Sequence, residues 1–147
     1  RIVDGHLAWM LTGDIERPIE RSLVDDGDPL ACDFLKVAHH GSKTSTTDGF
    51  VAAAHPRFAA ISVGFDNSYG HPAAEVVDRL EAAGAVVYRT DRDGAITSLG
   101  DGNQIEVSTY LHPPQQNSSA AAGMYGHALS RASALAATAA PSRRPFP

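Results

Sequence analysis

The sequence predicts a layered α/β domain, and two patterns support this prediction. Apolar, strand-like runs at 33–38, 58–64 and 85–90 alternate with helix-like segments at 44–56 and 71–84. In the last of these segments apolar residues recur at helical spacing after Pro72, a residue favoured in a first helical turn. Such alternation is typical of a sheet covered by helices.

Further elements are expected on both sides of this alternating core. A strand-like run at 8–11 leads through a Thr-Gly-Asp turn into a helix predicted at 15–24. Ser45 or Thr46 is the expected N-cap of the 44–56 helix, which should stop at the following His-Pro pair. The runs at 91–99 and 102–111 are expected to form hairpin strands, with turns at 93–94 and 102–103.

The last part of the chain differs in composition. Residues 113–147 are rich in Ala, Ser and Pro and poor in large apolar groups. We therefore divide the chain into a folded portion, 1–112, and a low-complexity tail, 113–147, that is expected to be disordered. A transient helix at 128–140 remains open.

The bulk composition fits a globular domain or part of one. The chain has 147 residues, of which 43% are apolar and 20% charged, and no uninterrupted apolar run is long enough to cross a bilayer. With Cys32 as the single cysteine, an internal disulfide and a Cys/His zinc ribbon are excluded. The opening, RIVDGHLAWMLTGD, has neither Met nor a signal-like basic region, so we expect a fragment that enters the middle of a fold.

Charge is distributed unevenly along the sequence. All 17 acidic residues and nine of the 12 basic residues precede His112, which gives that portion a net charge of −8. An acidic body is poorly suited to bind nucleic acid through a broad basic groove. We expect no independent nucleic-acid binding, and a phosphate-handling site would need bound cations or a partner surface.

Polar residues that could carry chemistry recur where strand-like runs end. They are Asp14, His39 and His40, then Asn67, Tyr69 and His71, and finally Thr90 and Asp91. In layered α/β domains the loops at one end of the strands converge on a common site. We therefore expect these groups to meet at one edge of the sheet.

Asp14 has two interpretations. As a residue before the 15–24 helix, Asp14 or Thr12 could be an N-cap, because aspartate is favoured there by capping and by the helix dipole. Alternatively, Asp14 could be a metal-bridging carboxylate, since its two oxygens can bind two ions.

The histidines are similarly ambiguous. Adjacent strand residues face opposite sides, so one of His39 and His40 should face the site while the other packs or orients it. They could be a structural pair at a strand end, or one could ligate a metal through a neutral imidazole. His71 could lie near a helix start by accident, or could face an anion or shuttle a proton.

A serine-nucleophile interpretation is not favoured for Ser42. The sequence around Ser42 and Lys43 contains neither a Ser-x-x-Lys nor a Gly-x-Ser-x-Gly pattern. Ser42 is instead expected to cap or line the turn after the histidines.

Taken together, these stretches resemble the end of a metallo-β-lactamase-fold hydrolase, and most closely the C-terminal domain of ComEC-type DNA-internalisation competence proteins. The stretches are LTGDIE, LKVAHHGSKTS and ISVGFDNSYGHPAAEVVDRLEAAGAVVYRTDRDGAI, in that order. The resemblance covers roughly 7–99. Its specificity lies in the combination of Thr-Gly-Asp, His-His-Gly-Ser, Tyr-Gly-His-Pro and Tyr-Arg-Thr-Asp-x-x-Gly.

The resemblance implies the C-terminal half of an αββα sandwich with two divalent ions, zinc or manganese, at one sheet edge. Asp14 matches the bridging aspartate, and His40, which precedes Gly41, matches the late histidine ligand, with His39 as the alternative. His71 could contact the scissile phosphate or shuttle a proton. Ser42, Asn67 and Tyr69 are candidate substrate-binding residues.

The principal ligand motif of the superfamily, His-x-His-x-Asp-His, is absent from this chain. We therefore expect an incomplete metal site and an inactive isolated chain. The implied parent is a polytopic membrane protein whose extracytoplasmic nuclease-like domain hydrolyses DNA during uptake. Upstream oligonucleotide-binding and channel domains would be its partners. The alternatives are another hydrolase of this fold, of the phosphorylcholine esterase or lactonase type, and a non-catalytic structural remnant.

Overall fold

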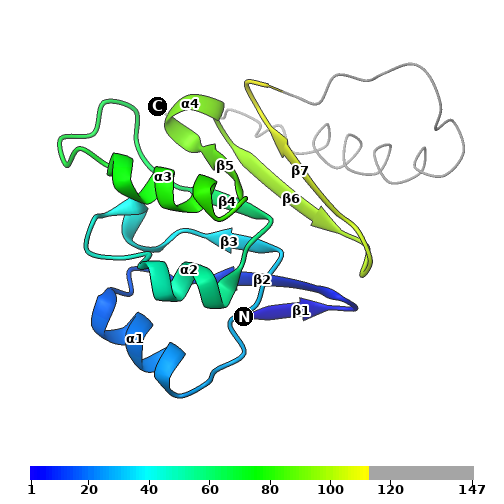
Figure 1. The fold of residues 1–147 in the computed structure, drawn as a ribbon. Coiled ribbons are helices and arrows are strands. Elements are labelled where there is room, and N and C mark those ends of the chain that lie inside the picture. The colour runs from blue at the N-terminus through cyan, green and yellow to red at the C-terminus, as the bar shows by residue number, and fades with distance from the viewer. Residues whose placement is uncertain (113–147) are drawn as a thin grey trace, which may run out of the picture. The chain divides into compact units, whose positions relative to one another are not determined.

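A five-stranded sheet organises residues 1–112, the part of the chain that the computed structural model describes (Figure 1). The strand order is β1-β2-β3-β4-β5. Four neighbours run parallel, namely β2 (Leu7–Leu11), β3 (Phe34–Lys36), β4 (Phe58–Ile61) and β5 (Val86–Arg89), while β1 (Ile2–Asp4) pairs antiparallel with β2. The predicted α/β class is confirmed, with a mixed parallel and antiparallel sheet.

Three helices lie along one face of this sheet, α1 (Arg17–Asp25), α2 (Asp48–Ala54) and α3 (Ala74–Ala82), as Figure 1 shows. The core forms between them and the sheet. Leu35 and Ile61 from the strands and Phe50, Val76 and Leu80 from the helices are at most 1% exposed. The helical spacing of the apolar residues in 71–84 therefore serves this packing, as the sequence predicted.

The opposite face of the sheet is partly covered by a hairpin of β6 (Ile96–Gly100) and β7 (Ile105–Thr109). Trp9 on β2 donates a hydrogen bond from Nε1 to Ser98 Oγ at 2.8 Å, which ties the hairpin to this face. Gly100 lies against the Trp9 ring so closely that a Cβ would collide with it. The hairpin turn at 102–103 is confirmed, with Asp101 Oδ1 accepting from the Asn103 and Gln104 amides.

Several local expectations were wrong. Thr47, rather than Ser45 or Thr46, is the N-cap of α2, and its Oγ1 accepts from the Phe50 amide at 3.4 Å. The Ser45 hydroxyl is instead buried and donates to backbone carbonyls of the preceding turn. Thr46 has a φ of 57°, which excludes the extended backbone that an N-cap needs.

The segment after β5 also differs from the prediction. Residues expected to begin a hairpin strand form a one-turn helix, α4 (Thr90–Asp93), and the predicted hairpin turn at 93–94 is not one. The Asp93 carboxylate accepts from the Arg89 amide at 2.8 Å and so closes this turn. Strand β1 was not predicted, and α3 begins at Ala74, two residues after the proline.

The predicted tail at 113–147, including its possible helix at 128–140, lies outside the described residues. Within residues 1–112, no helix has the length and apolar character needed to cross a membrane.

Candidate functional site at the carboxyl edge of the sheet

The loops that follow β2, β3 and β4 meet at the carboxyl edge of the parallel strands. The His39 amide donates to Gly13 O at 3.1 Å, which joins the loops after β2 and β3. His40 Nδ1 lies 2.6 Å from Ser62 O, which joins the loops after β3 and β4. The predicted meeting of these loops at one edge is confirmed.

Asp14 and His40 are brought together at this edge. His40 Nε2 lies 3.9 Å from Asp14 Oδ1, and both side chains are about half exposed or more. This separation is shorter than two metal–ligand bonds of roughly 2.0–2.2 Å laid end to end, so one ion can contact both atoms.

The protonation of His40 follows from its carbonyl contact. A carbonyl oxygen only accepts, so Nδ1 must carry the proton that it donates to Ser62 O. In the neutral ring this leaves the Nε2 lone pair free, on the side that faces Asp14. An imidazole held through one nitrogen by a backbone carbonyl is the usual arrangement of a histidine that ligates through the other.

The paired histidines do not lie on the strand. Strand β3 ends at Lys36, and the turn η1 (Ala38–Gly41) follows, with φ values of 46° for His39 and 56° for His40. Non-glycine residues in this left-handed region are strained, and such strain is concentrated at functional sites. Since the backbone turns here, the strand rule of opposite-facing neighbours does not apply to the pair.

His39 has a different environment from His40. Its Nδ1 atom lies 3.1 Å from Glu16 Oε1, but within residues 1–112 no acceptor completes a hydrogen bond with this buried atom. The Thr44 hydroxyl donates to the same Glu16 oxygen at 2.8 Å. Glu16 was not predicted as a site residue, because it falls at the start of the helix expected at 15–24.

The third histidine lies next to His39. The His71 and His39 rings are 6.1 Å apart, and Tyr69 stacks on His71 with a centroid distance of 6.0 Å. Tyr69 is 81% exposed, so its ring forms an open flank of the site. The predicted roles of His71 and Tyr69 stay predictions, but both side chains lie at the expected edge.

Asn67 and Ser42 make contacts that shape their own loops. The side-chain Nδ2 of Asn67 donates to Gly64 O and His71 O, and its Oδ1 accepts from the backbone amide of His71 at 3.0 Å. These bonds close the 64–71 loop. Ser42 is buried, and its hydroxyl lies 3.0 Å from Thr44 Oγ1, so it lines the turn as expected. A substrate contact by either residue stays a prediction.

The capping interpretation of Asp14 is wrong. Helix α1 begins at Arg17, its N-cap residue is Glu16, and no side chain makes a cap hydrogen bond. Thr12 does not cap the helix either, because its hydroxyl donates to Lys36 O at 2.7 Å and links β2 to β3. Asp14 is therefore left exposed at the sheet edge, opposite His40.

Thr90 and Asp91 hold the sheet edge in place. The Thr90 hydroxyl accepts from the Val63 amide and donates to Val63 O, each at 2.7 Å, which fixes the segment that follows β4. Asp91 receives two hydrogen bonds from Arg89, at 3.1 and 2.6 Å. These bonds hold the pKa of the Asp91 carboxyl below its usual range, because they favour the ionised form.

A buried carboxylate connects α1 to the loop before α2. Glu20 is fully buried and accepts from the backbone amides of Thr46 and Thr47. This contact was not predicted, since Glu20 falls among polar residues of an amphipathic helix. Through this contact α1 positions the 42–47 loop that follows the histidines.

The donors at this edge fit part of a metal site. Within the described residues no group of three or more His, Cys, Asp or Glu side chains could hold an ion. Asp14 and His40 are a pair of suitable donors, whereas zinc sites in proteins use three or four protein ligands. The residues therefore supply one side of such a site, and further ligands would have to come from elsewhere.

Comparisons with known proteins relate this segment to competence proteins. The chain is 40% identical over 92 residues to ComE operon protein 3 of Bacillus subtilis, covering 63% of this chain and 12% of that protein. It is 40% identical over 104 residues to Competence protein ComA of Neisseria gonorrhoeae, covering 69% of this chain and 15% of that protein. Recombination protein 2 of Haemophilus influenzae is 34% identical over 93 residues, 63% of this chain and 12% of that protein.

These similarities support a ComEC-type competence protein. The chain spans only 12–15% of the length of these curated relatives. No protein-family model and no solved structure matches it.

Proposed function

We propose that residues 1–112 form the C-terminal portion of a metallo-β-lactamase-fold domain whose parent hydrolyses phosphodiester bonds of DNA during natural competence. The observation that carries this proposal is the pairing of Asp14 Oδ1 with the free Nε2 of His40, 3.9 Å apart at the carboxyl edge of the sheet. The competence names of the relatives support the biological setting.

The sheet has an apolar face that supports the second half of the proposed sandwich. Opposite the helices, Ile2, Leu11 and Val86 are 49–57% exposed, and Phe58 and Tyr88, whose ring centroids are 6.4 Å apart, lie on the same face. The β6–β7 hairpin covers this face only in part, which leaves these apolar side chains for another layer of structure. We assign it to a second sheet, supplied by preceding sequence of the parent, which would complete the αββα arrangement.

Two divalent ions bound in the complete domain would supply Lewis-acid polarisation of a phosphoryl oxygen and activation of water at neutral pH. In this chain Asp14 and His40 would be ligands, with His39 as the alternative. His71, beside Tyr69, would contact the scissile phosphate or move a proton to or from it. The missing ligands would come from a His-x-His-x-Asp-His segment of the parent, so the isolated chain should be inactive.

The remaining parts of the parent complete the proposal. DNA would be held largely by an upstream oligonucleotide-binding domain, because a portion with a net charge of −8 does not favour broad DNA contact. An upstream membrane channel would import one strand, and the nuclease-like domain would lie outside the cytoplasm.

The test is substitution in the full-length protein. Asp14→Ala and His40→Ala should each abolish DNA uptake at normal expression, whereas His6→Ala should not, because the exposed His6 lies outside the site. Unchanged uptake in both site variants would favour a non-catalytic remnant.

A second test addresses the incomplete site. Metal titration of the purified 147-residue chain with zinc or manganese should show no tight binding of two ions. Stoichiometric tight binding of two ions would contradict the prediction that further ligands are needed.

A further inference from the structure

Four of the nine basic side chains within residues 1–112 have no carboxylate partner. Five of the nine basic residues before His112 pair with an acid: Arg21 with Asp25, Arg57 with Asp33, Arg79 with Asp48, Arg89 with Asp91 and Arg92 with Asp93. Within residues 1–112, the remaining four make no such pair, and two of these, Arg17 and Lys43, lie beside the histidine turn.

Arg17 and Lys43 are held together by the backbone. Arg17 donates from Nη2 to Lys43 O at 2.6 Å, and its amide donates to Thr44 O at 3.1 Å. Both side chains are exposed, and the remaining guanidinium donors of Arg17 make no hydrogen bond with residues 1–112. The Arg17 guanidinium is therefore held at the Lys43 peptide with donors to spare, and the exposed Lys43 side chain extends from that same peptide.

This pair adjoins the proposed site through Thr44. The Thr44 hydroxyl donates to Glu16 Oε1, and that oxygen lies 3.1 Å from His39 Nδ1. The Glu16 carboxylate is thus directed toward Thr44 and His39. His39, Glu16 and Thr44 thus form a connected series of contacts. Because the Arg17 amide binds Thr44 O and Lys43 precedes Thr44, the two cations lie on the flank of the histidine turn.

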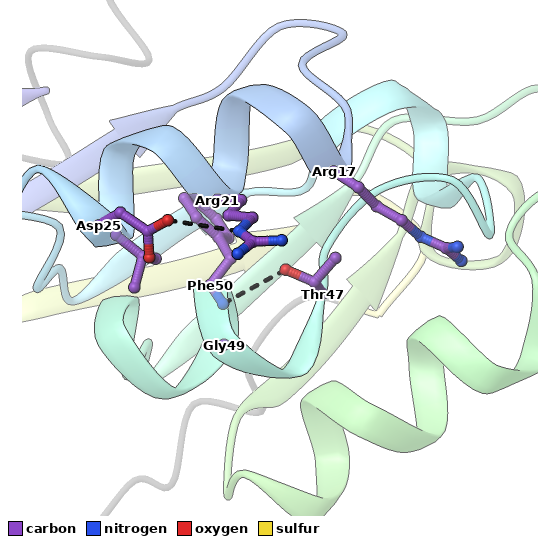
Figure 2. Close-up of a pocket in the computed structure, with 7 residues that line it drawn as sticks. Arg17, Arg21, Asp25, Thr47, Gly49 and Phe50 are labelled. Carbon is purple, nitrogen blue, oxygen red and sulfur yellow. Dashed lines mark hydrogen bonds and ion pairs between the residues drawn. The ribbon is translucent and has the colours of Figure 1, made fainter.

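The positive charge does not continue along the neighbouring cleft. A cleft of about 320 Å³ between α1 and α2 is lined by Arg17, Arg21, Val24, Asp25, Thr47, Gly49 and Phe50 (Figure 2). Arg21 lies 3.3 Å from Asp25, which offsets its charge. Figure 2 shows the Arg17 side chain extending away from this pair. The unpaired positive charge beside the histidine turn is therefore limited to Arg17 and Lys43.

We propose that Arg17 and Lys43 bind a backbone phosphate next to the scissile phosphate, and so favour a polynucleotide strand over a substrate with a single phosphate. This inference rests on the proposed function and adds two substrate-contacting residues to it. Guanidinium and ammonium groups are the usual protein partners of phosphate, and each nucleotide of a strand adds one negative charge. A small ester or a lactone has no second phosphate for this contact to bind.

The experiment compares two substrates in the purified full-length protein supplied with manganese. One is a single-stranded oligonucleotide, and the other is bis(p-nitrophenyl) phosphate, which carries a single phosphodiester. Arg17→Ala and Lys43→Ala should each raise KM for the oligonucleotide roughly tenfold, the effect of losing one charge-assisted contact. KM for the small diester should stay unchanged.

The matched control is Arg21→Ala, which removes the same charge from the same helix and cleft. It should leave both KM values unchanged, because the Arg21 charge is already offset by Asp25. In the salt dependence of oligonucleotide binding, Arg17→Ala should reduce the slope of log K against log salt by about 0.7, one contact for a single strand.

The inference would be overturned if Arg17→Ala left oligonucleotide KM within twofold of wild type, or if it affected both substrates equally. An equal effect of Arg21→Ala would also overturn it, since general electrostatics would then explain the loss. If the wild-type protein cleaves neither substrate, the proposed function fails. Fluorescence anisotropy in the presence of a chelator then tests the phosphate contact, by comparing oligonucleotide binding of wild type, Arg17→Ala and Arg21→Ala.

Discussion

The buried carboxylate of Glu20 provides the sharpest test of how this edge of the fold is held together. Glu20 is fully buried on α1 and accepts from the Thr46 and Thr47 amides, 26 and 27 residues along the chain. Arg79 donates to the Thr46 carbonyl at 2.8 Å, so a cation lies close to the same peptide. Replacing Glu20 with Ala would leave two backbone donors without their acceptor.

The cost can be worked out donor by donor. Thr46 is 1% exposed, so its amide cannot reach water and should bear the full penalty of about 2–3 kcal/mol for an unsatisfied buried donor. Thr47 is partly exposed, so its amide can be hydrated at a cost of about 1 kcal/mol. We expect Glu20→Ala to lower the free energy of unfolding by about 3–4 kcal/mol.

Glu20→Gln separates hydrogen bonding from volume. The glutamine oxygen can accept from one amide, but its NH₂ group would face the other donor, so a loss of about 2 kcal/mol is expected. The matched control is Glu81→Ala on the exposed surface of α3, which should change stability by less than about 0.5 kcal/mol. Urea unfolding of the purified chain, followed by circular dichroism, measures all three. A Glu20→Ala variant no less stable than Glu81→Ala would refute this account of the loop.

Three further predictions follow from the described residues. Burial, followed by the neighbouring Asp33 charge, raises the pKa of the Cys32 thiol to about 11, so folded protein should react slowly with a thiol reagent and unfolded protein rapidly; equal rates would contradict this. The pKa of Asp91 is lowered in the folded state by Arg89, so its stabilising contribution is present above the unfolded value of about 3.9 and is lost as pH falls through the folded value. The urea concentration at the unfolding midpoint should therefore decrease as the pH drops below about 4, and it should decrease less steeply in Asp91→Asn. Parallel pH dependences of the two proteins would exclude the Arg89–Asp91 pair as the cause. Gly41→Ala should cost about 2–3 kcal/mol, because φ is +80° and a Cβ would lie 2.6 Å from the Cβ of Pro72, whereas Gly64→Ala meets no atom and serves as the control.

The layers of the fold were predictable because they depend on local periodicity. Apolar spacing marked the helices and buried strands, and parallel strands necessarily place their carboxyl ends at one edge. This is why the meeting of the loops carrying Asp14 and His40 could be expected without a structure.

The polar contacts were not predictable in the same way. Glu16 and Glu20 look like ordinary exposed residues at the start of an amphipathic helix, yet one lies against His39 and the other is buried. Each interacts with residues more than 20 positions away, and helical periodicity carries no information about such partners. The N-cap at Thr47 was missed for a related reason. The Glu20 carboxylate binds the Thr46 and Thr47 amides just before the helix, and this distant partner is not visible in the local sequence.

The structure makes the two adjacent histidines unequal, and the backbone is the cause. If His39 and His40 continued β3, alternation would send one ring into the core and one away from it. Because the chain adopts left-handed conformations at both residues, both rings remain near the edge but meet different neighbours. A carbonyl fixes Nδ1 of His40 and leaves its Nε2 facing Asp14, whereas the Nδ1 of His39 faces the Glu16 carboxylate. The Nε2 of His40 is thus oriented as a metal ligand would be, while His39 is oriented toward the flank that carries Arg17 and Lys43. The left-handed backbone at these two residues therefore directs the two rings toward different neighbours.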